Sequence, residues 1–238
     1  MIKHWRAVAV VIISLISTWL LLFFLKNPLF NIDIFQKDII DFYLNYELST
    51  IILSLIFLFI IYILADKVRL KFFNINKLDG EVLPEPWVGI VPKKKESWKN
   101  IGLSVGSIIT ISTAVVVYFQ TAHGRGITIS MFPEVPMLLI LALMNSFTEE
   151  VIFRLSYSTI IANEGLNPRI AEVLAAVVFG GVHYVGIAPN GIAGAIMAGY
   201  IGWFLAKSIN ETNGFFWAWV VHFAQDVVIL FFLFMRNG

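Results

Sequence analysis

Long apolar runs without a charge restrict this chain to few architectures. Residues 7–25 read A-V-A-V-V-I-I-S-L-I-S-T-W-L-L-L-F-F-L. A helix that crosses the hydrocarbon core of a bilayer needs about 20 mainly apolar residues. Of the 238 residues, 58% are hydrophobic and 14% are charged, whereas a soluble domain has about 45–50% and about 25%. The chain is therefore expected to be all-α, a polytopic membrane helix bundle.

The hydropathy pattern predicts about seven membrane spans. They cover residues 7–25, 49–65, 101–119, 136–161, 168–185, 191–206 and 215–235. The fifth is short and could be a re-entrant helix. The mixed segment 26–48 is expected to be amphipathic and to lie at the membrane interface. In the sixth span, Gly and Ala recur at intervals of four, a pattern that lets helix backbones approach closely in lipid.

The distribution of positive charge predicts the orientation. The polar region 66–100 carries eight Lys and Arg out of the 17 in the protein, and cytoplasmic loops carry such an excess. We therefore expect this loop and the N-terminus to be cytoplasmic. Residues 1–100 then form a two-span N-terminal region, and residues 101–238 form a membrane-embedded core. The lysine run 93–95 is typical of contact with lipid head groups, so no nucleic-acid partner is expected.

Seven ionisable side chains fall inside the predicted spans. They are Glu149, Glu150, Arg154, Glu172, His183, His222 and Asp226. A charge at the bilayer centre costs about 2.5–3.5 kcal/mol on insertion scales, so such residues usually pair with one another and mark a functional site. The absence of cysteine excludes thiol nucleophiles, disulfides and zinc thiolates.

Helical spacing arranges these groups. Glu150 and Arg154 are four residues apart, in the favoured order for an ion pair on one helix face. This pair either fixes the fourth span structurally or takes part in the chemistry. Glu149 lies about 100° around the helix and is left freer, so that it can act as a general base. His222 and Asp226 share a second spacing of four residues, which lets the carboxylate orient the imidazole.

Some familiar metal chemistries lack their signatures in this sequence. No H-E-x-x-H is present, so the zincin pattern is absent. No E-x-x-H is present either, which argues against a di-iron bundle. Glu172 lies about 16 Å from His183 along the fifth span and is expected to be a boundary residue.

Three motifs in the C-terminal part resemble those of a known family. E-E-V-I-F-R (149–154) fits E-E-x-x-x-R, F-G-G-V-H (179–183) fits F-x-x-x-H, and H-F-A-Q-D (222–226) fits H-x-x-x-N/D. In this order on successive helices, they resemble the CPBP intramembrane proteases, which include CAAX proteases and bacteriocin-processing enzymes and are also called Abi proteins. The resemblance covers residues 136–235, and it implies an active site in a C-terminal four-helix core.

The resemblance implies a membrane endopeptidase in which a glutamate and a histidine activate water. By position, Glu149 would be the base and His183 its partner. His222 and Asp226 would line the oxyanion hole. Supporting roles would fall to Glu150 and Arg154.

Two chemical questions stay open at this point. An ionised Asp226 cannot donate a hydrogen bond to an oxyanion, so this residue is either protonated or orients His222. Glu149, His183 and His222 could also supply the three ligands of a zinc site with an open fourth position. The expected mechanism uses no cofactor, with zinc as the alternative.

The expected function is an intramembrane endopeptidase of the bacterial plasma membrane. It would cut a membrane-associated peptide or a lipidated protein near the cytoplasmic face. Prenylated proteins, bacteriocin leaders and quorum-sensing peptides all fit as substrates, and the compact size favours a bacterial enzyme for peptides. One alternative is a non-catalytic partner, in bacteriocin immunity or regulation. An ion-coupled transporter is disfavoured, because the first three spans do not repeat in the last four.

Overall fold

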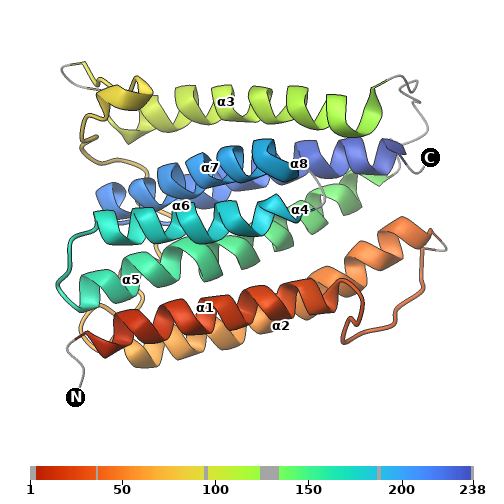
Figure 1. Ribbon diagram of the computed structural model, residues 1–238, viewed down its shortest axis with the longest axis horizontal. Coiled ribbons are helices and arrows are strands. Elements are labelled where there is room, and N and C mark those ends of the chain that lie inside the picture. Colours follow the sequence, from red (N-terminus) through yellow and green to blue (C-terminus); the bar gives the residue numbers. More distant parts are fainter. Residues whose placement is uncertain (1–3, 36, 94–95, 124–133, 187–188, 237–238) are drawn as a thin grey trace.

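Helices that run back and forth along one axis make up the protein (Figure 1). The computed structural model describes residues 4–35, 37–93, 96–123, 134–186 and 189–236. In these residues the α-helices are α1 (Trp5–Phe24), α2 (Asp38–Leu64), α3 (Trp98–Val117), α4 (Val135–Glu150), α5 (Ser156–Asn163), α6 (Arg169–Tyr184), α7 (Gly191–Thr212) and α8 (Phe216–Arg236). A π-helical turn, η4 (Val151–Leu155), joins α4 to α5 without a break. The predicted all-α membrane bundle is confirmed.

Six helices of the described part are long and apolar enough to cross a membrane, which makes this an integral membrane protein. They are Trp5–Phe24, Asp38–Leu64, Trp98–Thr121, Val135–Asn163, Gly191–Thr212 and Phe216–Phe234. The predicted fifth span is the exception. It corresponds to α6, whose 16 residues extend about 24 Å at 1.5 Å per residue, short of the hydrocarbon thickness of about 30 Å.

The second span is also longer than the hydropathy pattern predicts. The sequence places residues 26–48 at the interface, but α2 already begins at Asp38. Polar side chains in its first turns are satisfied locally, because Asp41 accepts hydrogen bonds from the backbone N–H groups of Ile34 and Phe35, each 3.2 Å long. This helix therefore carries polar residues deeper into the bundle than an interfacial segment would.

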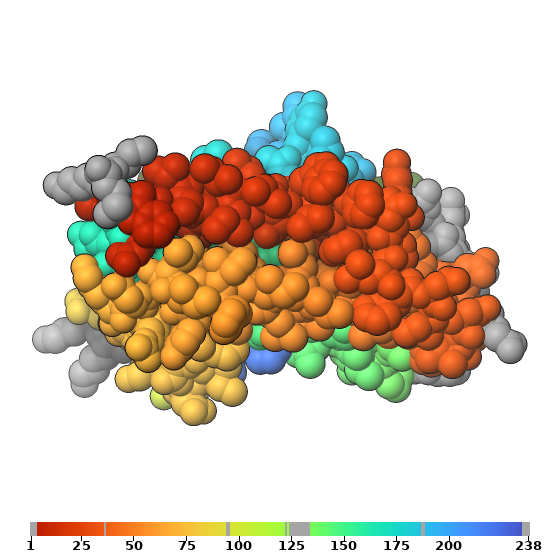
Figure 2. Space-filling view, turned by 90° about the horizontal axis from the view of Figure 1, so that it is seen from below, coloured from red at the N-terminus to blue at the C-terminus, as the bar shows by residue number. Residues whose placement is uncertain are grey.

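The C-terminal helices form the centre of the bundle, and the first two cover them. α8 packs against both α3 and α4, and α6 packs along α7. In Figure 2 the red and orange atoms of α1 and α2 form most of the visible face. A hydrogen bond of 2.5 Å between the hydroxyls of Ser14 and Tyr157 joins α1 to α5 inside this contact. The N-terminal hairpin is thus packed directly on the helices that carry the sequence motifs.

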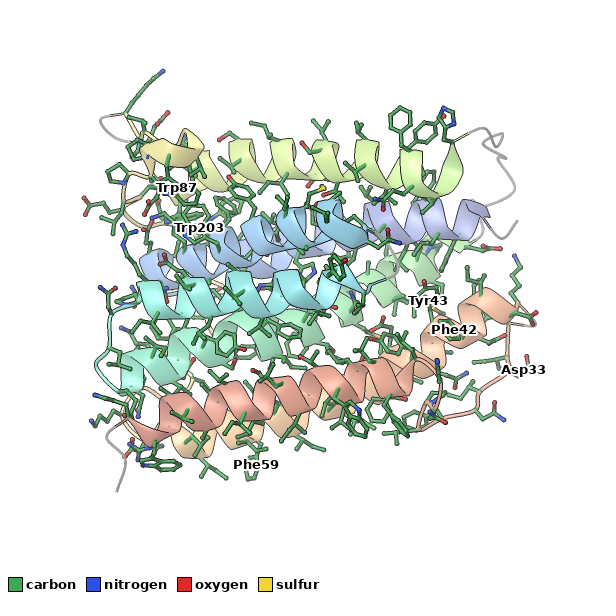
Figure 3. All side chains as sticks on the ribbon, viewed as in Figure 1. Asp33, Phe42, Tyr43, Phe59, Trp87 and Trp203 are labelled. Atoms are coloured by element: carbon green, nitrogen blue, oxygen red, sulfur yellow. The ribbon has the colours of Figure 1, made fainter. Side chains whose placement is uncertain are left out.

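Apolar side chains cover the outer surface, as expected for a bundle surrounded by lipid. On α3 the outward residues Leu103, Ile108, Ile111 and Val115 are 51–64% exposed. On α2, Phe59 points away from the bundle (Figure 3). Fully buried aromatic residues, among them Phe57, Phe153 and Phe204, fill the interior instead.

The basic loop between α2 and α3 is attached to one end of the bundle. Glu85 in this loop lies 2.9 Å from the Arg169 guanidinium and 3.6 Å from the buried Lys207 ammonium. The rings of Trp87 and Trp203 pack with centroids 5.1 Å apart (Figure 3). The loop is therefore a packed element rather than a free linker.

The N-terminal segment lies at the same end. Arg6 contacts Glu164 at 3.4 Å and Asp66 at 3.2 Å. The side-chain amide of Asn163 also donates to Asp66, and this bond, with the nearby Arg6, holds the pKa of the Asp66 carboxyl below its usual value. The N-terminus, the basic loop and the α5–α6 turn thus share one end of the bundle.

Glycines let α6 and α7 approach closely, which confirms the packing predicted from the Gly and Ala repeat. A Cβ on Gly199 would lie 3.3 Å from the Ala176 carbonyl oxygen, and one on Gly202 would lie 2.6 Å from that of Ala175. On α6, a Cβ on Gly180 would lie 2.8 Å from the Ala195 oxygen. This contact fixes the position of the end of α6.

Gly180→Ala is expected to destabilise the protein, whereas Gly181→Ala is not. A Cβ at Gly180 would meet backbone atoms of α7, but a Cβ at Gly181 would meet nothing within 4 Å. Overpacking of this kind costs about 1–3 kcal/mol. Unfolding of the detergent-solubilised protein measures the difference. Equal free energies of unfolding for the two variants would contradict the close approach of α6 to α7 at Gly180.

Candidate active site

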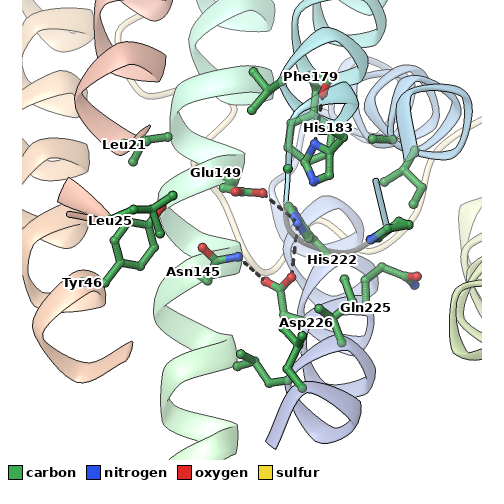
Figure 4. Close-up of a pocket in the computed structure, with 18 of the residues that line it drawn as sticks. Leu21, Leu25, Tyr46, Asn145, Glu149, Phe179, His183, His222, Gln225 and Asp226 are labelled. Carbon is green, nitrogen blue, oxygen red and sulfur yellow. Dashed lines mark hydrogen bonds and ion pairs between the residues drawn. The ribbon is translucent and has the colours of Figure 1, made fainter. Parts of the chain in front are cut away.

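A cavity of about 180 Å³ lies among α1, α2, α3, α4, α6, α7 and α8. Its polar lining includes the carboxylates of Glu47, Glu149 and Asp226 and the imidazoles of His183 and His222. Figure 4 shows the Glu149 carboxylate and both imidazoles facing the same space. Four residues that the sequence singles out therefore meet at one cavity, although they come from three helices.

The cavity extends from the middle of the bundle toward the end opposite the basic loop. Glu149 lies at the midpoint of the continuous helix Val135–Asn163. The lining residues Leu25 and Leu233 lie near the ends of α1 and α8 that point away from the loop. The site therefore lies halfway along this helix, away from the basic loop.

His222 is the residue that connects the two glutamates. Its Nδ1 lies 2.6 Å from Oε1 of Glu150, and its Nε2 lies 3.2 Å from Oε2 of Glu149. An ionised carboxylate only accepts hydrogen bonds, so this arrangement favours a proton on each ring nitrogen. His222 is then an imidazolium held between two carboxylates of α4.

The two adjacent glutamates differ in their surroundings. Glu150 is fully buried and lies 3.2 Å from the Arg154 guanidinium, the pair that the spacing predicts. The Glu149 side chain is 16% exposed and lines the cavity. The π-helical turn η4 follows Glu150 directly, and Arg154 lies within it with its guanidinium carbon 3.6 Å from the centroid of the Phe179 ring. π-Helical turns inside α-helices are frequent at functional sites, and periodicity alone did not reveal this one.

His183 presents one nitrogen to the cavity. Its Nδ1 lies 3.0 Å from the backbone carbonyl oxygen of Phe179. A carbonyl can only accept, so Nδ1 carries the hydrogen and Nε2 carries the lone pair in the neutral ring. Among the described residues, no hydrogen-bond partner occupies Nε2 of His183. This nitrogen is available to a molecule in the cavity.

Asp226 accepts hydrogen bonds from one side and faces an imidazolium on the other. The side-chain amide of Asn145 donates to its Oδ2 at 3.1 Å, and Nε2 of His222 lies 3.7 Å from its Oδ1. Sequence reasoning missed Asn145, although it stands four residues before Glu149 and thus on the same helix face. It also missed Glu47, because α2 was expected to begin after it.

Glu172 lies outside this site. It accepts a hydrogen bond from the side-chain amide of Asn210 at 3.1 Å, at the end of the bundle that holds the basic loop.

The zinc alternative stays a prediction. Zinc would bind Nε2 of His222 through a free lone pair, and in this structure that nitrogen lies 3.2 Å from the Glu149 carboxylate. In the described part of the chain, no three His, Asp or Glu side chains are arranged to hold one metal ion.

A comparison with protein families identifies one match. The family described as type II CAAX prenyl endopeptidase Rce1-like matches residues 131–228. This segment contains all three motifs, so the similarity to CPBP intramembrane proteases is confirmed over it. No curated protein and no solved structure matches the chain significantly.

Proposed function

We propose that this membrane protein is an endopeptidase in which Glu149 activates water without a bound metal. The observation that carries the proposal is the cavity that Glu149, His183 and His222 line together. Ionisable side chains are costly inside a bilayer and usually serve a function there. The match of residues 131–228 to an endopeptidase family supports a hydrolytic function.

The first step is the attack of water on the scissile carbonyl. The Glu149 carboxylate takes one proton from the water, and the oxygen forms a bond to the carbonyl carbon. Nε2 of His183 accepts a hydrogen bond from the same water, because its Nδ1–H is donated to Phe179. His183 thereby positions the water, and Glu149 acts as the base.

The next requirement is a donor for the oxyanion. His222 holds a proton on Nε2, 3.2 Å from Glu149. When Glu149 takes up the water proton, its charge is lost and its hold on this N–H weakens. The N–H can then turn to the developing oxyanion. Glu149 finally gives its proton to the leaving nitrogen as the C–N bond breaks, which restores the carboxylate.

Asp226 has a positioning role in this scheme. An ionised carboxylate cannot donate to an oxyanion, and Asp226 already accepts from Asn145. It orients Asn145 and the His222 ring, in place of the oxyanion-hole role that the family resemblance implies. Glu150 holds His222 from the opposite side and is itself paired with Arg154.

The substrate is a membrane-associated peptide or a lipidated protein in the bacterial plasma membrane. With the basic loop in the cytoplasm, the cavity extends from the bilayer centre toward the outer face. We therefore expect cleavage at mid-membrane depth, in place of the cytoplasmic face predicted from the sequence.

Peptidomics of membranes that contain the wild type or Glu149→Gln tests the proposal. Glutamine keeps the shape of Glu149 but cannot accept a proton, so products seen with the wild type should disappear. The exposed Glu81 provides a matched control, and Glu81→Gln should leave the products unchanged. Treatment with a metal chelator should also leave them unchanged.

Identical peptidomes for wild type and Glu149→Gln would exclude the peptidase. A cellular phenotype that survives Glu149→Gln but is lost on altering residues 66–93 would support the non-catalytic partner instead.

A further inference from the structure

Glu47 is a buried carboxylate of the cavity that the proposed chemistry does not use. It lies on α2, outside the segment that matches the family. Its residue is 2% exposed, and it lines the same cavity as Glu149 and Asp226. Its side chain accepts one hydrogen bond, from the Thr50 hydroxyl one turn along its own helix, at 3.3 Å and on Oε2. In the described part of the chain, no cationic side chain is paired with it.

Acidic side chains outnumber basic ones in the cavity lining. Its lining includes three carboxylates, those of Glu47, Glu149 and Asp226, and it includes no Lys or Arg. The imidazolium of His222 serves Glu149, Glu150 and Asp226. Arg154 lies behind the lining, against Glu150. A buried carboxyl without a cationic partner ionises only at a cost, and a cation bound beside Glu47 would offset that cost.

The neighbours of Glu47 fit an organic cation rather than a metal ion. Tyr43 and Tyr46 line the cavity from the same helix, and Leu21 and Leu25 line it from α1. Figure 4 shows Leu21, Leu25 and Tyr46 on the side of the cavity opposite His183 and His222. Aromatic rings attract ammonium and guanidinium groups, and leucine side chains pack against the methylene stem of a lysine or arginine.

We propose that Glu47 binds a cationic group of the substrate, either a Lys or Arg side chain or a free α-ammonium, close to the bond that is cut. This inference rests on the proposed endopeptidase function. Charge complementarity of this kind provides specificity more than binding strength. The N-terminal hairpin then selects the peptide, while the family-matching segment performs the hydrolysis.

A matched pair of peptides tests the inference in proteoliposomes. Two internally quenched, N-acetylated peptides differ only in lysine or norleucine near the scissile bond. The wild type should cleave the lysine peptide with a kcat/KM about 30-fold higher, the equivalent of about 2 kcal/mol for one buried charge pair. In Glu47→Gln this preference should disappear. Glu172→Gln, which removes another buried carboxylate at the far end of the bundle, should keep it.

Peptides with a free amino terminus distinguish the source of the cation. If they are preferred over their acetylated forms in the wild type but not in Glu47→Gln, Glu47 binds the α-ammonium. A preference for lysine in the acetylated pair identifies the side chain. A wild type that favours neither cation, or a preference that persists in Glu47→Gln, overturns the proposal.

A binding measurement separates this inference from the peptidase itself. Nα-acetyl-lysine amide, which keeps its side-chain ammonium, should raise the Tm of the wild type. Nα-acetyl-norleucine amide should not. In Glu47→Gln the two compounds should have the same effect on the Tm. A lysine-specific Tm shift without any Glu149-dependent cleavage would overturn the peptidase but keep the cation site. Cleavage with neither the lysine-specific shift nor a Glu47-dependent preference for free amino termini would overturn the cation site alone.

Discussion

His222→Ala is expected to abolish cleavage and also to destabilise the protein, whereas His183→Ala should abolish cleavage alone. Both imidazoles line the cavity, and each contribution to proton transfer or oxyanion binding is worth about 10²–10⁴-fold in rate. Their structural contacts differ. His222 joins α8 to both glutamates of α4, but within the described residues the hydrogen bond of His183 is to a carbonyl of its own helix.

The expected difference in stability between His222→Ala and His183→Ala follows from the hydrogen-bonding groups that each substitution leaves without a partner. Without His222, the fully buried Glu150 loses its hydrogen bond of 2.6 Å, and an unsatisfied buried acceptor costs about 1–3 kcal/mol. Without His183, the Phe179 backbone carbonyl loses its side-chain partner, and Glu150 keeps its hydrogen bond from His222. Kinetics on a cleaved peptide and unfolding in detergent give the two readouts.

His123→Ala is the matched control, because His123 follows the π-helical turn Tyr118–Ala122 that extends α3, and it does not line the cavity. It should change neither activity nor stability. If His183→Ala and His222→Ala had the same stability, His222 would not connect α8 to α4 as the structure shows.

Local contacts of the site were predictable from the sequence, and contacts between helices were not. The Glu150–Arg154 pair follows from the spacing of four residues on one helix. The contact of His222 with both glutamates depends on how α8 packs against α4 and on the π-helical turn after Glu150. No pattern within a single segment carries that information.

Helix boundaries show the same limit. Apolar runs predicted the long spans, because hydrocarbon thickness sets their length. The fifth span was predicted to be short, and α6 has 16 residues. The early start of α2 at Asp38 was not predicted, because polar side chains satisfied by the protein can continue a membrane helix. The missed start of α2 explains why Glu47 was assigned to an interfacial segment.

Arg154→Met is expected to cause a large loss of stability, about 3–5 kcal/mol, because it removes one partner of a fully buried ion pair. The Arg154 guanidinium lies 3.2 Å from Glu150 and over the Phe179 ring, and both charged side chains are 0% exposed. The variant leaves the Glu150 carboxylate with His222 alone. Denaturation of the purified protein in detergent measures the loss.

The double variant Arg154→Met/Glu150→Gln separates the ion pair from the packing of the arginine. The side-chain carbonyl of the introduced glutamine still accepts the hydrogen bond from His222, but no unpaired charge remains. We expect this variant to be more stable than Arg154→Met, with a coupling of about 1–3 kcal/mol between the two sites. Lys99→Met is the control, because Lys99 lies 3.8 Å from Asp79 and these side chains are 59% and 50% exposed, and such surface pairs contribute about 0–1 kcal/mol. If the losses of stability from the two substitutions were strictly additive, Glu150 and Arg154 would not act as a pair. The distinct role of Glu149 would then follow from its exposure to the cavity alone.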